Sequence, residues 1–204
     1  MTRRRCPAWV PATVLALTVA QLLVGTLAPD LEQFEGKAFG ARLVGYPLMM
    51  LVVPAAWWLA HRGRTVPVPW GAFALVMAPF LVDVTGNTLD LYDTVVWWDD
   101  ANHFANWAML CGGLGLLVLG GIEQPWARVL LVTGIGAALA IGWELGEWYT
   151  FIRHGTELDT AYEDTLGDEA LGTLGALVAG VLLRRPQPAE VPDSAASRAA
   201  NPAA

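Results

Sequence analysis

Long apolar runs separated by short polar segments dominate this sequence. An apolar run of about 20 residues is long enough to cross the hydrocarbon core of a membrane as a helix. Six runs approach that length, at residues 8–28, 43–60, 66–82, 101–120, 126–150 and 164–183. The last run is fully apolar only from residue 170, so it reaches spanning length only if it begins near Asp164. The pattern predicts an all-α fold, an integral membrane bundle of six transmembrane helices that occupies residues 1–185.

The segment from residue 186 to residue 204 has a different composition. It is rich in Pro, Ala and Ser and has no periodic apolar face. Such a segment cannot bury enough apolar surface to offset the entropy of ordering. It is therefore predicted to be a disordered cytoplasmic tail.

The overall composition agrees with a membrane protein. Of the 204 residues, 55% are hydrophobic and 15% are charged, against roughly 25% charged in a typical soluble domain. The net charge of −7 opposes binding of nucleic acid, which attracts basic surfaces. Two cysteines exclude a disulfide scaffold and a cysteine-rich zinc site. Membrane lipids are the expected surroundings.

Basic residues predict the orientation of the bundle. Arg3, Arg4 and Arg5 precede the first apolar run, which could be a cleaved signal peptide. That run is longer than a usual signal core and no clear cleavage site precedes Pro29, so an uncleaved helix is expected. With both termini in the cytoplasm, nine of the twelve Lys and Arg residues lie on the inner side, as the positive-inside rule requires.

Acidic residues gather at the opposite, outer ends of the predicted helices. Sixteen of the nineteen Asp and Glu residues lie there. Several form pairs three or four residues apart, and residues at that spacing share one face of a helix. The pairs are Asp83 with Asn87, Asp99 with His103, Glu144 with Glu147, and Asp164 with Asp168. Since all four pairs lie at one depth, they are predicted to converge on a common site.

Glu144 carries the strongest hint about chemistry, because it directly follows an uncharged apolar window from 130 to 142. A carboxylate in that setting must be paired, protonated or bound to metal. The outer side offers too few cations for pairing. Carboxylates with an imidazole suit Mn, Fe or Zn, and carboxylates alone suit Mg or Ca. A divalent metal ion is therefore expected, with ligands among Asp83, Asp99, His103, Glu144, Glu147, Asp164 and Asp168. A proton- or cation-conducting acidic cavity and a structural polar network remain the alternatives.

The same residues carry a resemblance to known families. The segments 83–87, 91–93, 98–104, 143–147 and 164–168, followed by Gly172 and Gly175, resemble the YjdF-like bacterial inner-membrane proteins. More distantly, the order of acid, histidine and last-helix acid resembles the VanZ-like proteins, although the arginine that usually precedes their last-helix acid is missing. The resemblance implies a location in the bacterial cytoplasmic (inner) membrane and hints at the cell envelope.

The leading functional hypothesis is a metal-dependent hydrolase or transferase that acts on an envelope or lipid substrate. His103, Glu144 and Glu147 are the expected catalytic residues, with His103 as a ligand or general base. A proton or cation transporter is a second hypothesis, and the lack of charge in the inner halves of the helices counts against it. A non-catalytic membrane scaffold is the third.

Overall fold

The computed structural model describes residues 6–35, 37–150, 152–154 and 161–185. The predicted tail at 186–204 lies outside the described residues. Throughout the described part the chain is helical, and no strand is found there. The long helices are α1 (Trp9–Leu27), α2 (Phe39–His61), α3 (Trp70–Thr88), α5 (Trp98–Val118), α6 (Pro125–Thr150) and α7 (Ala161–Leu182). Three short elements join them, namely α4 (Leu91–Thr94) and the 3₁₀ turns Glu32–Phe34 and Ile152–His154. The all-α class is thus confirmed.

Five helices in the described part are long and apolar enough to cross a membrane, namely α1, α2, α3, α6 and α7. The remaining long helix, α5, has 21 residues. Its first half carries Asp99, Asp100, Asn102, His103 and Asn106, and these make it too polar to qualify by composition. The predicted number of six spans is therefore not confirmed.

Two helix boundaries differ from the sequence prediction in ways that matter for the site. The third helix was expected to end at residue 82 but continues to Thr88. Its polar end folds as helix because the side chains of Asn87 and Thr88 donate to the helix carbonyls of Asp83 (3.0 Å) and Val84 (2.8 Å). Helix α5, which corresponds to the fourth predicted run, begins at Trp98, three residues earlier than expected, so Asp99 and Asp100 lie in its first turn. Negative charge is favourable there because the helix dipole is positive at that end.

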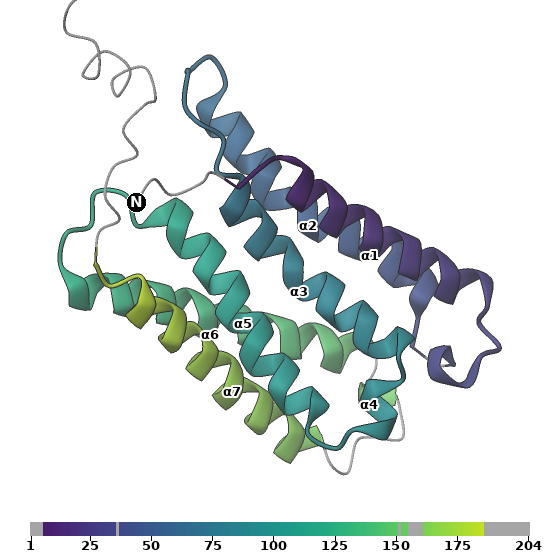
Figure 1. The fold of residues 1–204 in the computed structure, drawn as a ribbon. Coiled ribbons are helices and arrows are strands. Elements are labelled where there is room, and N and C mark those ends of the chain that lie inside the picture. The colour runs from purple at the N-terminus through teal and green to yellow at the C-terminus, as the bar shows by residue number, and fades with distance from the viewer. Residues whose placement is uncertain (1–5, 36, 151, 155–160, 186–204) are drawn as a thin grey trace, which may run out of the picture.

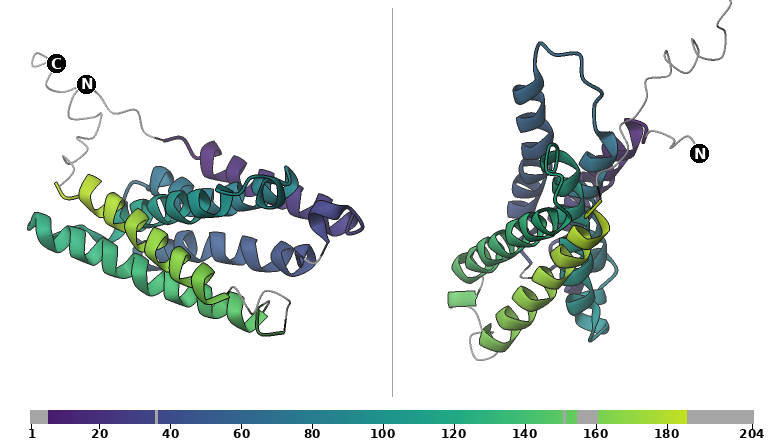
Figure 2. Two further views of the ribbon diagram at one scale, coloured as in Figure 1. Left: turned by 90° about the horizontal axis from the view of Figure 1, so that it is seen from below. Right: turned by 90° about the vertical axis from the view of Figure 1, so that its left-hand side faces the viewer.

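The helices form two groups that meet along one seam (Figures 1 and 2). Helices α1, α2 and α3 pack on one another, and so do α5, α6 and α7. Contact between α3 and α5 joins the groups. Each group has its own apolar core: the first contains Leu22, Phe39 and Val84, and the second contains Val132 and Ala176. Because α5 belongs to the seam, its position is fixed from both sides.

Glycines allow the close approach of α5 to its neighbours. A Cβ atom at Gly113 would lie 2.8 Å from the carbonyl oxygen of Ala72 in α3, and one at Gly175 would lie 2.3 Å from the carbonyl oxygen of Phe104. Only glycine permits backbones to pack so closely, as is common between membrane helices. These contacts set the depth and rotation of α5, which carries much of the site described below.

A buried arginine closes the end of the bundle where α5 and α7 terminate. Arg128 is only 5% exposed. Its Nε donates to the carbonyl oxygen of Leu183 at 2.7 Å, and its Nη1 donates to those of Leu119 (3.0 Å) and Ile122 (2.9 Å). The final carbonyls of a helix have no partner within the helix. Arg128 therefore binds the ends of two helices and the turn between α5 and α6, where the sequence suggested only a cytoplasmic charge.

Candidate functional site

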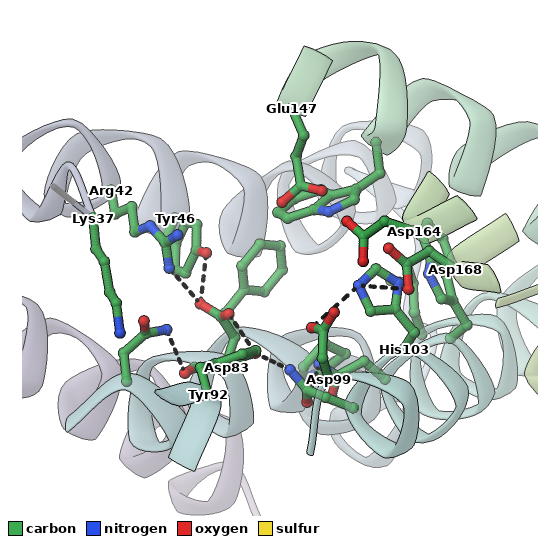
Figure 3. A pocket seen from close by; sticks show the side chains of 18 of the residues that line it. Lys37, Arg42, Tyr46, Asp83, Tyr92, Asp99, His103, Glu147, Asp164 and Asp168 are labelled. Atoms are coloured by element: carbon green, nitrogen blue, oxygen red, sulfur yellow. Dashed lines mark hydrogen bonds and ion pairs between the residues drawn. The ribbon is translucent and has the colours of Figure 1, made fainter. Parts of the chain in front are cut away.

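A cavity of about 580 Å³ lies at the opposite end of the bundle, with walls from α2, α3, α5, α6 and α7 (Figure 3). Six of the seven predicted site residues line it, namely Asp83, Asp99, His103, Glu147, Asp164 and Asp168. Glu144 does not. It is 7% exposed and buried in α6, but its side chain is not part of the cavity wall. The acidic pairs of α3, α5 and α7 thus deliver their acids to one space, and α6 delivers only the second acid of its pair.

Helix α5 contributes a continuous polar stripe to the wall. Asp99, Asn102, His103 and Asn106 follow the spacing of one helix face, and all four line the cavity. Asn106 donates to Oδ1 of Asn102 at 2.7 Å. The opposite faces of α5 pack on α3 and α7, so its polar groups face the cavity and its apolar groups face the core. This explains how a helix with so polar a first half folds within an apolar bundle.

Asp99 and His103 of α5 form a compact cluster with Asp168 of α7. The Nε2 atom of His103 lies 3.6 Å from Oδ1 of Asp99 and 3.5 Å from Oδ1 of Asp168. One ligand atom from each of the three residues lies within 4.8 Å of the others. Ligands about 2.1 Å from a tetrahedral zinc ion are about 3.4 Å apart, so the two distances from Nε2 are already close to those around one shared ion. One imidazole with two carboxylates is a donor set suited to Mn, Fe or Zn.

Two features of this cluster point to a missing partner. The side chain of Asp168 is 6% exposed, faces the cavity and receives no hydrogen bond from the described residues. The Nδ1 atom of His103 is buried, also without a hydrogen-bond partner in the described part of the chain. A metal-bound imidazole commonly donates from its other nitrogen, and that supporting contact is not seen. The cluster therefore has the ligand atoms of a metal site but not the usual support for its histidine.

Asp83 belongs to a second polar cluster, on the other side of the same cavity (Figure 3). Its carboxylate accepts hydrogen bonds from Arg42 Nη1 (3.1 Å), Tyr46 Oη (2.6 Å) and Tyr92 Oη (2.9 Å). Asn102 in turn donates to the hydroxyl of Tyr92. With three hydrogen-bond donors around it, one of them the cation Arg42, Asp83 is already satisfied by the protein and does not join the cluster of His103.

Sequence reasoning missed the partners of Asp83. Arg42 and Tyr46 are four residues apart, the same helical spacing that drew attention to the acids. Asn102 and Asn106 lie at helical spacing from Asp99 and His103. Extending the search for pairs from acids to every polar residue would have found all four. Tyr92 lies in the short helix α4, for which the apolar pattern gave no signal.

Lys37 and Asp93 form an ion pair at the mouth of the cavity. The ammonium group of Lys37 donates a hydrogen bond to Asp93 and so holds the pKa of that carboxyl below its usual value. Taken together, the cavity wall carries six carboxylates and two cations. Arg42 offsets Asp83 and Lys37 offsets Asp93. Asp99, Glu147, Asp164 and Asp168 form no ion pair with a lysine or arginine among the described residues, and only His103, if protonated, pairs with Asp99 and Asp168.

A set of apolar helices of membrane length, folded around a polar cavity at one end, defines a helical multi-pass membrane protein. The family described as "Predicted membrane protein (DUF2238)" matches residues 10–187, and the chain belongs to it. This confirms the YjdF-like resemblance, while the more distant VanZ-like resemblance is not shown. No curated protein and no solved structure matches the chain.

Proposed function

We propose that this protein binds a divalent metal ion through Asp99, His103 and Asp168 and uses it in a hydrolase or transferase reaction on an envelope or lipid substrate. The observation that carries the proposal is the triad itself, whose ligand atoms come from α5 and α7 and face a cavity of about 580 Å³. Cavities of this size hold small molecules and lipid head groups. A bound cation would offset the electrostatic repulsion among the carboxylates that have no ion-pair partner.

Each wall of the cavity has a role in this proposal. Asp99, His103 and Asp168 hold the ion, which would supply Lewis-acid catalysis and a bound water of lowered pKa. Glu147 lines the wall formed by α6, where its carboxylate would receive a cationic or proton-donating group of the substrate. Glu144 does not line the cavity and is left out of the ligand and catalytic set. The Arg42–Asp83 pair, held by two tyrosines, keeps the far wall in place.

The proposal includes an orientation in the bacterial cytoplasmic membrane. Helix α5 is long enough to span, and its polar stripe faces the cavity rather than lipid. Counting it gives six spans, with both termini in the cytoplasm and the cavity at the outer surface. The positive-inside distribution of arginine and lysine supports this arrangement.

Metal titration of the purified, metal-free protein tests the proposal. Isothermal titration with Mn²⁺, Zn²⁺ and Mg²⁺ should show one saturable site, and His103→Ala should weaken it by at least about tenfold because a ligand is lost. His61→Ala is the matched control, since His61 lies in the last turn of α2, stacked on Trp57 and outside the cavity. The proposal fails if the wild type shows no binding, or if both variants bind as the wild type does.

A further inference from the structure

The lining of the cavity changes character with depth. On α3, Asp83 and Asn87 lie nearest the mouth, while Pro79 and Phe80 lie a turn deeper. On α5, Asp99 and His103 precede Trp107 and Leu110, which lie one and two turns further in. On α6, Trp143 is one turn deeper than Glu147. The cavity therefore has a charged mouth and a mostly apolar, aromatic floor, in which the amide of Asn106 beside Trp107 is the polar group.

This gradient has the same direction as that of a lipid in the outer leaflet. In such a lipid the polar head lies at the membrane surface and the chains point toward the bilayer centre. A soluble, fully polar ligand would leave the floor of Phe80, Trp107, Leu110 and Trp143 in contact with polar groups or water. An amphiphile satisfies both layers at once, since its apolar part covers the floor.

The acidic residues at the mouth of the cavity favour a head group that carries a positive charge. Once the two ion pairs are set aside and an ion neutralises Asp99 and Asp168, Glu147 and Asp164 still form no ion pair among the described residues. They lie on α6 and α7, and neither belongs to the compact ligand cluster. An organic cation can bridge groups too far apart for one metal ion. Aromatic faces also favour ammonium groups, and Trp143 lines the cavity one turn below Glu147 on the same helix.

We propose that the cavity binds the head of an amphiphilic lipid that carries an ammonium group, with Glu147 and Asp164 facing the ammonium and the aromatic floor facing the first part of the chains. This assignment rests on the proposed function for the orientation of the cavity and for the ion beside the head group. It names the substrate class of that site. A phosphate in the same head group, as in an aminophospholipid, would lie beside the ion.

Binding of three matched compounds tests this assignment. Protein in a neutral detergent, saturated with Mn²⁺, is titrated with short-chain phosphatidylethanolamine, with phosphatidylglycerol of equal chain length, and with glycerophosphoethanolamine, which has the head but no chains. Phosphatidylethanolamine should bind saturably, about tenfold more tightly than either of the other two, because only it offers both the ammonium and the chains. Equal binding of phosphatidylglycerol would overturn the ammonium selectivity. Equal binding of glycerophosphoethanolamine would indicate that the ligand is a soluble amine, and it would overturn the proposal that the ligand is a lipid.

Substitutions locate the site and separate it from the metal. Glu147→Gln should bring the affinity for phosphatidylethanolamine down to that for phosphatidylglycerol while leaving Mn²⁺ affinity unchanged. Asp164→Asn provides a second variant in case the first does not fold. Glu163→Gln, on an exposed residue of α7 outside the cavity, should change neither affinity. Unchanged lipid selectivity in both cavity variants overturns the assignment. Absence of Mn²⁺ binding in the wild type, with its selectivity for phosphatidylethanolamine retained, would instead overturn the proposed metal site and leave the lipid assignment standing.

Discussion

The Nε2 atom of His103 in α5 lies 3.5 Å from the Oδ1 atom of Asp168 in α7. The two residues are far apart in sequence, so the contact exists only because α5 and α7 pack closely. That packing depends on Gly172 and Gly175, which face Trp107 and the backbone at Phe104. The candidate metal site is therefore a property of the helix interface and not of a local motif.

Asp168→Asn should separate the effects of charge and of metal. The change keeps the shape of the side chain and removes one of the uncompensated charges, so the protein in chelator should become more stable, by about 1 kcal/mol. The wild type should gain about 2.7 kcal/mol from an ion at 100 times its dissociation constant, and the variant should gain much less. Thermal unfolding with chelator and with added ion measures both effects. An equal metal response in the two proteins would remove Asp168 from the ligand set.

Gly175→Ala should destabilise the protein by about 2 kcal/mol, because overpacked sites cost that much and the new Cβ would lie 2.3 Å from a backbone oxygen that cannot rotate away. Gly134→Ala is the matched control, since a Cβ at Gly134 in α6 meets nothing within 4 Å. The control should unfold at the wild-type temperature or slightly above it. Equal stability of both variants would contradict the close packing of α5 on α7.

Arg128→Ala should lower the free energy of unfolding by about 3 kcal/mol, since three carbonyls lose their donor and two of those hydrogen bonds are buried. Arg128→Lys should recover only part of the loss, because an ammonium cannot reproduce the planar fork of a guanidinium. Arg184→Ala, at an exposed position, should have little effect. Metal affinity in a folded Arg128 variant should match that of the wild type, because Arg128 and the carbonyls that it binds lie at the end of the bundle opposite the cavity.

The Lys37–Asp93 pair should make a small, pH-dependent contribution to stability. The pKa of Asp93 is lowered in the folded protein by the hydrogen bond from Lys37. Its contribution is therefore complete above the ordinary aspartate pKa and is lost as the pH falls through the lowered value. The stability difference between the wild type and Asp93→Asn should shrink over that acidic range. A difference that grows on acidification would contradict the pairing.

Cysteine labelling tests the orientation. In a protein with Cys6 and Cys111 replaced by serine, Val96→Cys should react with a membrane-impermeant maleimide in intact cells, because Val96 is 99% exposed beside the cavity end. Arg64→Cys, in the loop at the other end, should react only after the membrane is permeabilised. The reverse pattern would place the cavity in the cytoplasm.

The long helices could be predicted because spanning length leaves a strong apolar signal. Each predicted run overlaps one of the six long helices of the described part, although only five of these qualify as membrane spans. Asp83, Asp99, His103, Glu147, Asp164 and Asp168 do line one cavity. Spacing shows which residues share a helix face. It does not show which way that face points. For this reason Glu144, although paired with Glu147 in sequence, was wrongly expected to face the common site.

The division of the acids into two clusters could not be predicted. Asp83 and Asp99 look alike in sequence, yet one is satisfied by Arg42 and two tyrosines while the other lies beside His103. That difference arises from contacts between α2, α3 and α4, which depend on tertiary packing. The end of α3 was also misplaced, because Asn87 and Thr88 extend a helix that apolar periodicity alone would stop earlier.

The glycine contacts on both sides of α5 have a consequence for binding affinity. At Gly113 the backbone of α5 packs closely on that of α3, and at Phe104 it packs closely on Gly175 of α7, so α5 is held on two sides. Asp99 and His103 are thus oriented when the chain folds, before any ion arrives. Much of the conformational entropy that a flexible site would lose on binding is lost during folding instead. A preorganised site of this kind needs fewer ligands to reach a given affinity, and three from two immobile helices can suffice.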